Sequence, residues 1–196
     1  MRVLSESTLS AYASLFWRRQ AAKLDPNDRD ALADINAGGD PVQWLQRSYR
    51  YKLPEAKNDV VSIVQIETRE ELDGLLVHDY VPCDGWMRAR DLVPSPYTRK
   101  LGQLARTFLD RGYFATPRSD RLYLHFRTWR RTGSLTGVID PEDRPLIEAV
   151  EPAAKREYEI VDGWGRLLPF AALLWEGLAF RAFEAFVASS SLTKPS

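Results

Sequence analysis

Residues 1–58 carry hydrophobic side chains three and four residues apart, which is the spacing of one helix face. This spacing predicts a first helix over residues 8–24. Two further helices are expected, because an aspartate caps a helix and a proline suits its first turn. The two start signals are Asp25-Pro26 and Asp40-Pro41. The sequence therefore predicts a helical N-terminal extension over residues 1–58.

Residues 59–188 alternate between strand-like and amphipathic stretches, which predicts a core of the α+β class with mixed strands and helices. The predicted strands cover residues 60–66, 86–93, 121–129, 158–161 and 180–188, and the predicted helices start at Thr68 and cover residues 98–112 and 167–177. A turn at residues 132–134 would return the chain into a partner strand, so we expect an inserted hairpin near residues 121–139. Residues 189–196 are small and polar and are expected to form a flexible tail.

The composition is that of an ordinary globular protein and excludes several classes. The 196 residues include 44% hydrophobic and 28% charged side chains, and the formal net charge is zero. Cys83 is the single cysteine, so the chain holds neither an internal disulfide nor a cysteine-based zinc cluster. No apolar run approaches the roughly 20 residues of a membrane-spanning helix. We therefore expect a cytoplasmic protein without membrane insertion.

The zero net charge conceals two blocks of opposite sign. Residues 97–131 contain nine basic and two acidic side chains, a local charge of +7. Residues 140–162 contain three basic and eight acidic ones, a local charge of −5. Most residues of the basic block are arginine, whose guanidinium group makes bidentate contacts with phosphate. The predicted DNA-binding residues are Arg118, Arg121, Arg127, Arg130 and Arg131.

Aromatic side chains are interleaved with these arginines, among them Tyr113, Phe114, Tyr123, Phe126 and Trp129. Stacking surfaces beside arginines suit single-stranded nucleic acid or a nucleotide base. The alternative is a solvated basic face that balances the acidic block, with the aromatic rings in the core.

A sharper feature is the turn that follows the predicted strand ending near Asp162. Gly163 and Gly165 permit a tight turn, and a helix follows. Free backbone N–H groups at a helix start bind anions, and Arg166 in the first turn can reach the same anion. The alternative is a plain strand–turn–helix connection without a ligand.

The segment Gly163-Trp164-Gly165-Arg166 resembles the ParB/sulfiredoxin superfamily, whose hallmark is a strand, a Gly-x-x-Arg turn and a helix. Two upstream segments resemble the family in the same order. They are residues 89–97, with a proline-rich end, and residues 112–117, where a glycine after a helix is followed by a proline. Together the matches span residues 86–188 and imply a ParB/sulfiredoxin-like core.

Departures from the family pattern exclude sulfinic-acid reduction and argue against chromosome partitioning through a CTP clamp. Trp164 occupies the place of the cysteine that sulfiredoxins require, and Trp164 with Gly165 replaces the acidic residue and second arginine of the chromosome-partitioning proteins. A chain of this size with a helical extension resembles the plasmid fertility-inhibition proteins of the oncogenic suppression type. That resemblance implies ATPase and DNase activity that blocks conjugative or T-DNA transfer. It also implies the transferred DNA strand and a type IV secretion coupling protein as partners.

The implied site combines a divalent ion such as Mg²⁺ with ATP as the substrate. Asp162 and Glu159 are the nearest carboxylates for the ion. Arg166 and Asp162 would act in catalysis, and His125 is the candidate general base. The expected nucleotide-binding residues are Gly163, Trp164, Gly165, Arg166, Arg99 and Lys100, with Arg118 beside them.

Two other classes remain open. In one, the fold is kept without chemistry, and the arginine block binds DNA or a protein as an adaptor. In the other, the chain is an antitoxin-type or immunity-type protein with a tight protein partner. Phosphate release from ATP and the salt dependence of DNA binding would separate these classes.

Overall fold

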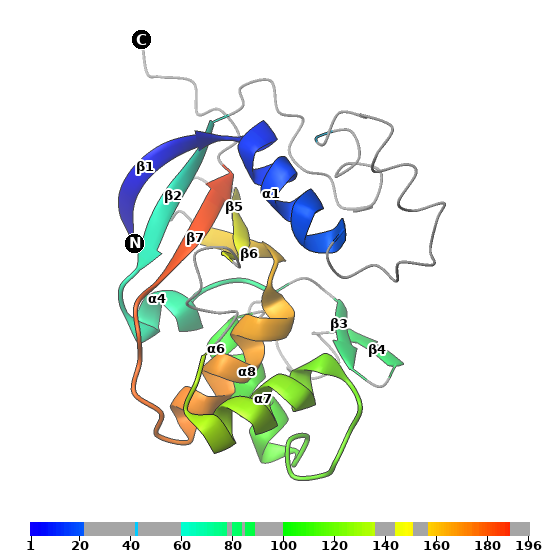
Figure 1. The fold of residues 1–196 in the computed structure, drawn as a ribbon. Coiled ribbons are helices and arrows are strands. Elements are labelled where there is room, and N and C mark those ends of the chain that lie inside the picture. Colours follow the sequence, from blue (N-terminus) through cyan, green and yellow to red (C-terminus); the bar gives the residue numbers. More distant parts are fainter. Residues whose placement is uncertain are drawn as a thin grey trace.

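The fold is described by a computed structural model, shown in Figure 1. It describes residues 1–21, 42, 60–77, 80–83, 85–88, 100–135, 144–150 and 157–188. The helices are α1 (Leu9–Ala21), α4 (Arg69–Asp73), α6 (Leu101–Asp110), α7 (Arg121–Thr132) and α8 (Trp164–Trp175). The strands are β1 (Arg2–Thr8), β2 (Val60–Ile66), β3 (Tyr80–Cys83), β4 (Gly85–Arg88), β5 (Leu146–Val150), β6 (Glu157–Asp162) and β7 (Phe183–Ala188).

Within these residues, five strands form one mixed sheet in the order β1-β2-β7-β5-β6. The pairs β1–β2, β2–β7 and β5–β6 are antiparallel, whereas β5 and β7 are parallel. Strands β3 and β4 form a separate antiparallel pair. Helices combined with a mixed sheet confirm the predicted α+β class.

The sheet buries both of its faces against helices. Alternate residues of a strand face opposite sides, so β2 and β7 contribute to two apolar clusters. On one side Val61 and Phe186 pack with Tyr12 of α1, whose ring meets that of Phe186 edge-on at 5.1 Å. On the other side Ile66 and Phe183 belong to the larger core cluster formed with α6, α7 and α8.

Helix α8 is the centre of that larger cluster and contacts both α6 and α7. Residues Leu167 to Leu174 are all buried, which is the pattern of a helix surrounded by protein. Figure 1 shows α7 lying across the front of α8. One side of α7 therefore packs into the core, while its outer side is left to solvent.

The helix predicted over residues 8–24 is confirmed as α1, but the N-terminal extension is not purely helical. Residues 2–8 form β1, which pairs with β2 and joins the sheet. The helix begins at Leu9 because the Thr8 hydroxyl oxygen accepts a hydrogen bond from the Ala11 N–H at 3.1 Å. Residues 22–41 and 43–59 lie outside the described residues, so the two later helices of the extension stay predictions.

The hairpin predicted near residues 121–139 is wrong, because residues 121–132 form helix α7. Asp120 caps this helix by accepting a hydrogen bond from the Tyr123 N–H at 3.0 Å, and Gly133 ends it in the left-handed region at φ 66°. The alternating residue types predicted a strand, but the side chains that the structure buries recur at the spacing of a helix. The side chains that follow this spacing are Leu122, Phe126 and Trp129.

Other elements match the predictions more closely. The strands predicted at 60–66, 158–161 and 180–188 are confirmed as β2, β6 and β7, and the capping box of Thr68 and Glu71 is present at α4. Strand β5 in the acidic segment was not predicted. Helix α8 begins at Trp164, earlier than the predicted 167. Of the strand predicted at 86–93, only the part in β4 lies within the described residues, because residues 89–99 lie outside them. The tail predicted at 189–196 also lies outside the described residues.

Candidate functional site

The turn between β6 and α8 is built around Gly163. This residue caps α8 with φ 97°, a conformation that favours glycine. A side-chain Cβ at this position would lie 2.7 Å from the Pro145 Cβ and 3.1 Å from Arg166 Nη2. The Gly163 carbonyl accepts the backbone N–H groups of Arg166 and Leu167, both at 2.9 Å. No side chain caps the helix, and the helical geometry leaves the earlier N–H groups of the first turn without intrahelical acceptors.

The structure brings the two predicted catalytic residues of this turn together as an ion pair. Arg166 Nη2 lies 3.6 Å from Asp162 Oδ2, and the side chains are 14% and 20% exposed. This distance is longer than a hydrogen bond, and Asp162 Oδ2 has no hydrogen-bond partner among the described residues. The guanidinium that would bind a nucleotide phosphate is therefore partly neutralised by the carboxylate beside it.

A bulge in β6 sets the relation between Asp162 and Glu159. Leu146 pairs with Asp162 and Ile147 pairs with Ile160, so Val161 is the extra residue. Because Leu146 and Ile147 face opposite sides of the sheet, this register puts Asp162 and Glu159 on the same side, away from Ile160. The two predicted metal ligands thus share a sheet face.

By themselves these two carboxylates do not complete a metal centre, so the predicted role in binding a divalent ion stays a prediction. Within the described parts of the chain, no group of three or more His, Cys, Asp or Glu side chains is placed to hold one. The Asp162 carboxylate already lies beside the Arg166 guanidinium, whose positive charge opposes a second cation. We therefore derive no step through Mg²⁺ from these residues.

Lys100 lies near this turn through the backbone rather than through its side chain. Leu76 forms isolated bridges with both Lys100 and Glu159, so a short segment separates Lys100 from the outer edge of β6. The Lys100 side chain is exposed. Lys100 is the N-cap residue of α6, and its side chain makes no capping hydrogen bond. Arg99 lies outside the described residues, so its predicted role in nucleotide binding stays a prediction.

The α7 basic face is a second cationic region, formed by Arg121, Arg127, Arg130 and Arg131. All four side chains are exposed, and α7 contains no acidic residue. Arg130 Nε lies 3.1 Å from the Glu176 carboxylate. The other three arginines form no ion pair with any residue that the structure describes. Among the described residues, a carboxylate therefore neutralises only Arg130, and the other three arginines present their positive charge to solvent.

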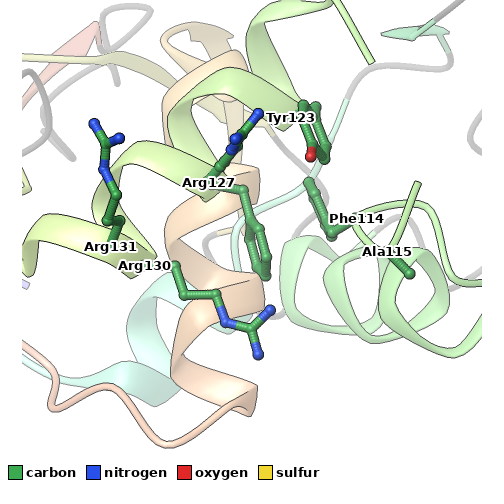
Figure 2. A pocket seen from close by; sticks show the side chains of 7 residues that line it. Phe114, Ala115, Tyr123, Arg127, Arg130 and Arg131 are labelled. Carbon is green, nitrogen blue, oxygen red and sulfur yellow. The ribbon is translucent and has the colours of Figure 1, made fainter. Parts of the chain in front are cut away.

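A pocket of about 360 Å³ lies beside this face. Figure 2 shows Arg127 on the side of Tyr123 and Phe114, while Arg130 and Arg131 leave α7 in other directions. The three guanidinium groups thus rim the pocket without meeting at one point. Its lining residues are Phe114, Ala115, Tyr123, Phe126, Arg127, Arg130 and Arg131.

The aromatic residues between the arginines belong to the core, which corrects their interpretation as stacking surfaces. Phe126 and Trp129 are 2% and 3% exposed, and Tyr123 is 7% exposed. The rings of Phe114 and Phe126 stack on each other with centroids 4.1 Å apart and an angle of 14° between them. The faces of these two rings therefore contact each other rather than solvent.

The two remaining predicted site residues contact aromatic rings. The Arg118 guanidinium stacks 4.3 Å from the centroid of the Tyr113 ring, and its residue does not line the pocket. His125 lies on α7 rather than on a hairpin, and its ring stacks on Trp129 at 4.9 Å. The predicted site residues that the structure describes thus belong to the turn at Gly163, to the start of α6, and to α7 with the loop before it.

Comparison of the chain with protein-family models, curated proteins and solved structures found no significant match. Among the described residues, no helix has the length and apolar character needed to cross a membrane.

The sequence indicated the arginines of α7 but placed them on a predicted hairpin. For that reason it did not indicate the other residues that are exposed beside them on the helix. Leu124 and Thr128 are exposed on the same helix and were not selected. The available signals were the Asp120 cap, the Gly133 end and the spacing of the buried residues between them.

Proposed function

We propose that this protein binds DNA through the α7 basic face and acts as a DNA-binding inhibitor or adaptor. The observation that carries this proposal is an acid-free helix with four exposed arginines, of which Arg121, Arg127 and Arg131 lack an ion pair within the described residues. Guanidinium groups in such a cluster repel one another unless an anion lies between them. A polyanion supplies many such charges at once.

DNA suits this face because its phosphates are closely and regularly spaced. A duplex carries one negative charge per roughly 1.7 Å of its axis, and neutralising these phosphates releases condensed counterions. Arginine is also the side chain whose planar donor groups match phosphate oxygens. Net neutrality of the whole chain then limits indiscriminate binding to other polyanions.

The resemblance to the fertility-inhibition proteins supports a role for this binding in blocking DNA transfer. On this proposal α7 holds the DNA, and a type IV secretion coupling protein is the implied protein partner. No metal-dependent step is needed for this proposal.

A second candidate is binding and hydrolysis of a nucleotide at the glycine turn. The uncapped first turn of α8 and the nearby Arg166 favour it. Phosphate release from ATP in Mg²⁺ buffer, with and without DNA, tests this candidate. Turnover that disappears in a folded Arg166→Ala variant would support hydrolysis over the non-enzymatic proposal.

The binding proposal is tested by fluorescence anisotropy with a labelled oligonucleotide between 50 and 200 mM salt. We expect the logarithm of the binding constant to fall linearly with the logarithm of salt concentration, with a slope of about −2 to −4 for two to four phosphate contacts. The Arg121→Ala variant should lower the steepness of that slope by about 1 and weaken binding about eightfold at 0.1 M salt.

Arg2→Ala is the matched control, because it removes one positive charge from β1 rather than from α7. Arg2 is exposed and lies beside Glu67, with Nε 3.0 Å from the carboxylate. Its affinity and salt dependence should stay close to those of the parent protein. Absence of DNA binding at 50 mM salt, or equal losses in both variants, would contradict the proposal.

A further inference from the structure

The side of α7 that faces away from the core forms a straight row of side chains. Leu122, Phe126 and Trp129 point into the core, and the opposite side carries residues spaced three, four and seven positions from Leu124. We call this row the outer ridge. Its members are Leu124, Arg127, Thr128 and Arg131, all of them exposed.

The chemistry of the outer ridge matches the edges of base pairs. Arginine makes bidentate hydrogen bonds to the O6 and N7 atoms of guanine, and threonine bonds to several base edges. An apolar side chain contacts the thymine methyl group. Leu124 is 48% exposed, so its side chain is available for such a contact.

Arg121 and Arg130 lie on the two flanks of the outer ridge, at the first and third turns of the helix. In a protein–DNA complex such flanking residues contact phosphates and fix the orientation, whereas the central ones contact bases. A row of base-contacting residues with a basic residue on each side is the arrangement expected of a helix between two phosphate backbones.

The dimensions also agree. A helix with its side chains is about 10–12 Å across, and the major groove of B-DNA is about 12 Å wide and 8.5 Å deep. Helix α7 has 12 residues and is therefore about 18 Å long. It lies at the front of the helical layer in Figure 1, with α8 behind it.

Recognition of single strands has the weaker support. Single-strand binding depends on aromatic faces that bases can stack on. Here Phe114, Tyr123 and Phe126 are at most 7% exposed, and two of these rings stack on each other. The face retains contacts for phosphates and base edges but offers little area for stacking.

We infer that α7 enters the major groove of double-stranded DNA, with the outer ridge on the base edges and Arg121 and Arg130 on the two backbones. This inference rests on the proposed DNA-binding function and narrows it to one form of DNA and one groove. The aromatic pocket then serves to support the helix rather than to receive a base.

The experiment compares a labelled 20-base-pair duplex with each of its single strands in the same buffer, using the full chain. We expect at least about tenfold tighter binding to the duplex, because only the duplex has a major groove in which the outer ridge and both flanking arginines make contacts together. Methyl green, which occupies the major groove, should compete with the protein, and netropsin, which occupies the minor groove, should not.

A Thr128→Glu variant places a carboxylate in the middle of the outer ridge and should reduce duplex binding at least about tenfold. Gln103→Glu adds the same charge on the exposed side of α6 and should change binding less than threefold. Circular dichroism melting shows whether both variants stay folded. Since residue 128 is exposed, we expect unchanged melting.

Equal or tighter binding to single strands, competition by netropsin alone, or equal losses in the two variants would overturn the groove inference while leaving the DNA-binding proposal in place. Absence of binding to every oligonucleotide at 50 mM salt would overturn both.

Discussion

Arginine occupies two contrasting settings in this molecule. At the glycine turn, Arg166 is 14% exposed and lies beside Asp162. On α7, Arg121, Arg127 and Arg131 are exposed and form no ion pair within the described residues. The guanidinium at the turn is mostly buried beside a carboxylate, whereas the guanidinium groups on α7 are exposed to solvent.

This difference indicates what each region contributes. A mostly buried ion pair that lost one partner would leave a poorly solvated charge, so breaking the pair at the turn should destabilise the fold. Exposed arginines add little to stability, because water solvates them in the folded and the unfolded chain alike. They are therefore available for an external anion. The comparison predicts that changes at the turn alter stability, while changes on α7 alter binding.

The largest effect is expected for Gly163→Ala. The residue has φ 97°, and an added Cβ would lie 2.7 Å from the Pro145 Cβ. Left-handed strain and overpacking together should lower the free energy of unfolding by about 2–4 kcal/mol. Urea denaturation followed by circular dichroism measures this change.

Gly165→Ala is the control within the same motif. An added Cβ there has no heavy atom within 4 Å, and the residue lies in the first turn of α8. Alanine should stabilise this position by about 0.5–1 kcal/mol, because glycine loses more conformational freedom on folding. Destabilisation of equal size by both substitutions would show that the turn does not depend on the geometry of Gly163.

The second prediction concerns the ion pair. Arg166→Ala leaves the Asp162 carboxylate without its nearest positive charge and should cost about 1–2 kcal/mol, less than a fully buried pair because both groups retain some solvent contact. Adding Asp162→Asn removes the stranded charge and should recover part of the loss. Urea denaturation of the two single variants and the double variant forms a complete cycle. Additive losses would mean that the two side chains do not interact.

Strong local signals allowed much of the sheet and one helix start to be predicted from sequence. Strand β2 has a run of β-branched residues, and the Thr68 capping box depends on contacts three residues apart. Strands β1 and β5 escaped prediction for a physical reason. Residues 2–8 are almost entirely exposed at the sheet edge, so no hydrophobic alternation marks them. Strand β5 lies in a segment whose acidic composition obscured it.

The candidate site was less predictable than the fold. The sequence located Gly163 and Arg166, but the placement of Asp162 and Glu159 on one sheet face depends on a bulge at Val161 that no residue type announces. On α7, alternating residue types favoured a strand, and the packing of α7 on α8 decided for a helix. Whether an aromatic ring stacks on a ligand or on its neighbour depends on such packing.

The third prediction tests the helix on which the binding face depends. Asp120→Ala removes the cap that accepts the Tyr123 N–H and should destabilise the protein by about 1 kcal/mol. Asp120→Asn keeps a capping oxygen while removing the charge, so its melting should stay close to that of the parent. Thermal denaturation measures both. Equal destabilisation by both variants would assign the effect to the lost charge instead of the cap.

The smallest effect is expected for Glu176→Gln, which tests whether a change at the α7 basic face alters DNA binding without altering stability. Arg130 and Glu176 are 63% and 30% exposed, and such a pair contributes about 0.2–1 kcal/mol. Releasing Arg130 should change thermal stability little. It should tighten DNA binding by about two- to fivefold, because the freed guanidinium becomes available to a phosphate and the nearby negative charge is gone.

The matched control is Asp110→Asn, which removes one negative charge from α6. Asp110 is 60% exposed and pairs with Arg106 at 3.0 Å, so the chemical change is the same at a site off α7. Anisotropy titrations at 100 mM salt should show tighter DNA binding for Glu176→Gln than for Asp110→Asn. Equal gains would mean that net charge sets the affinity. A gain confined to Glu176→Gln locates the DNA at Arg130, because charges further apart than the roughly 10 Å Debye length at this salt are largely screened.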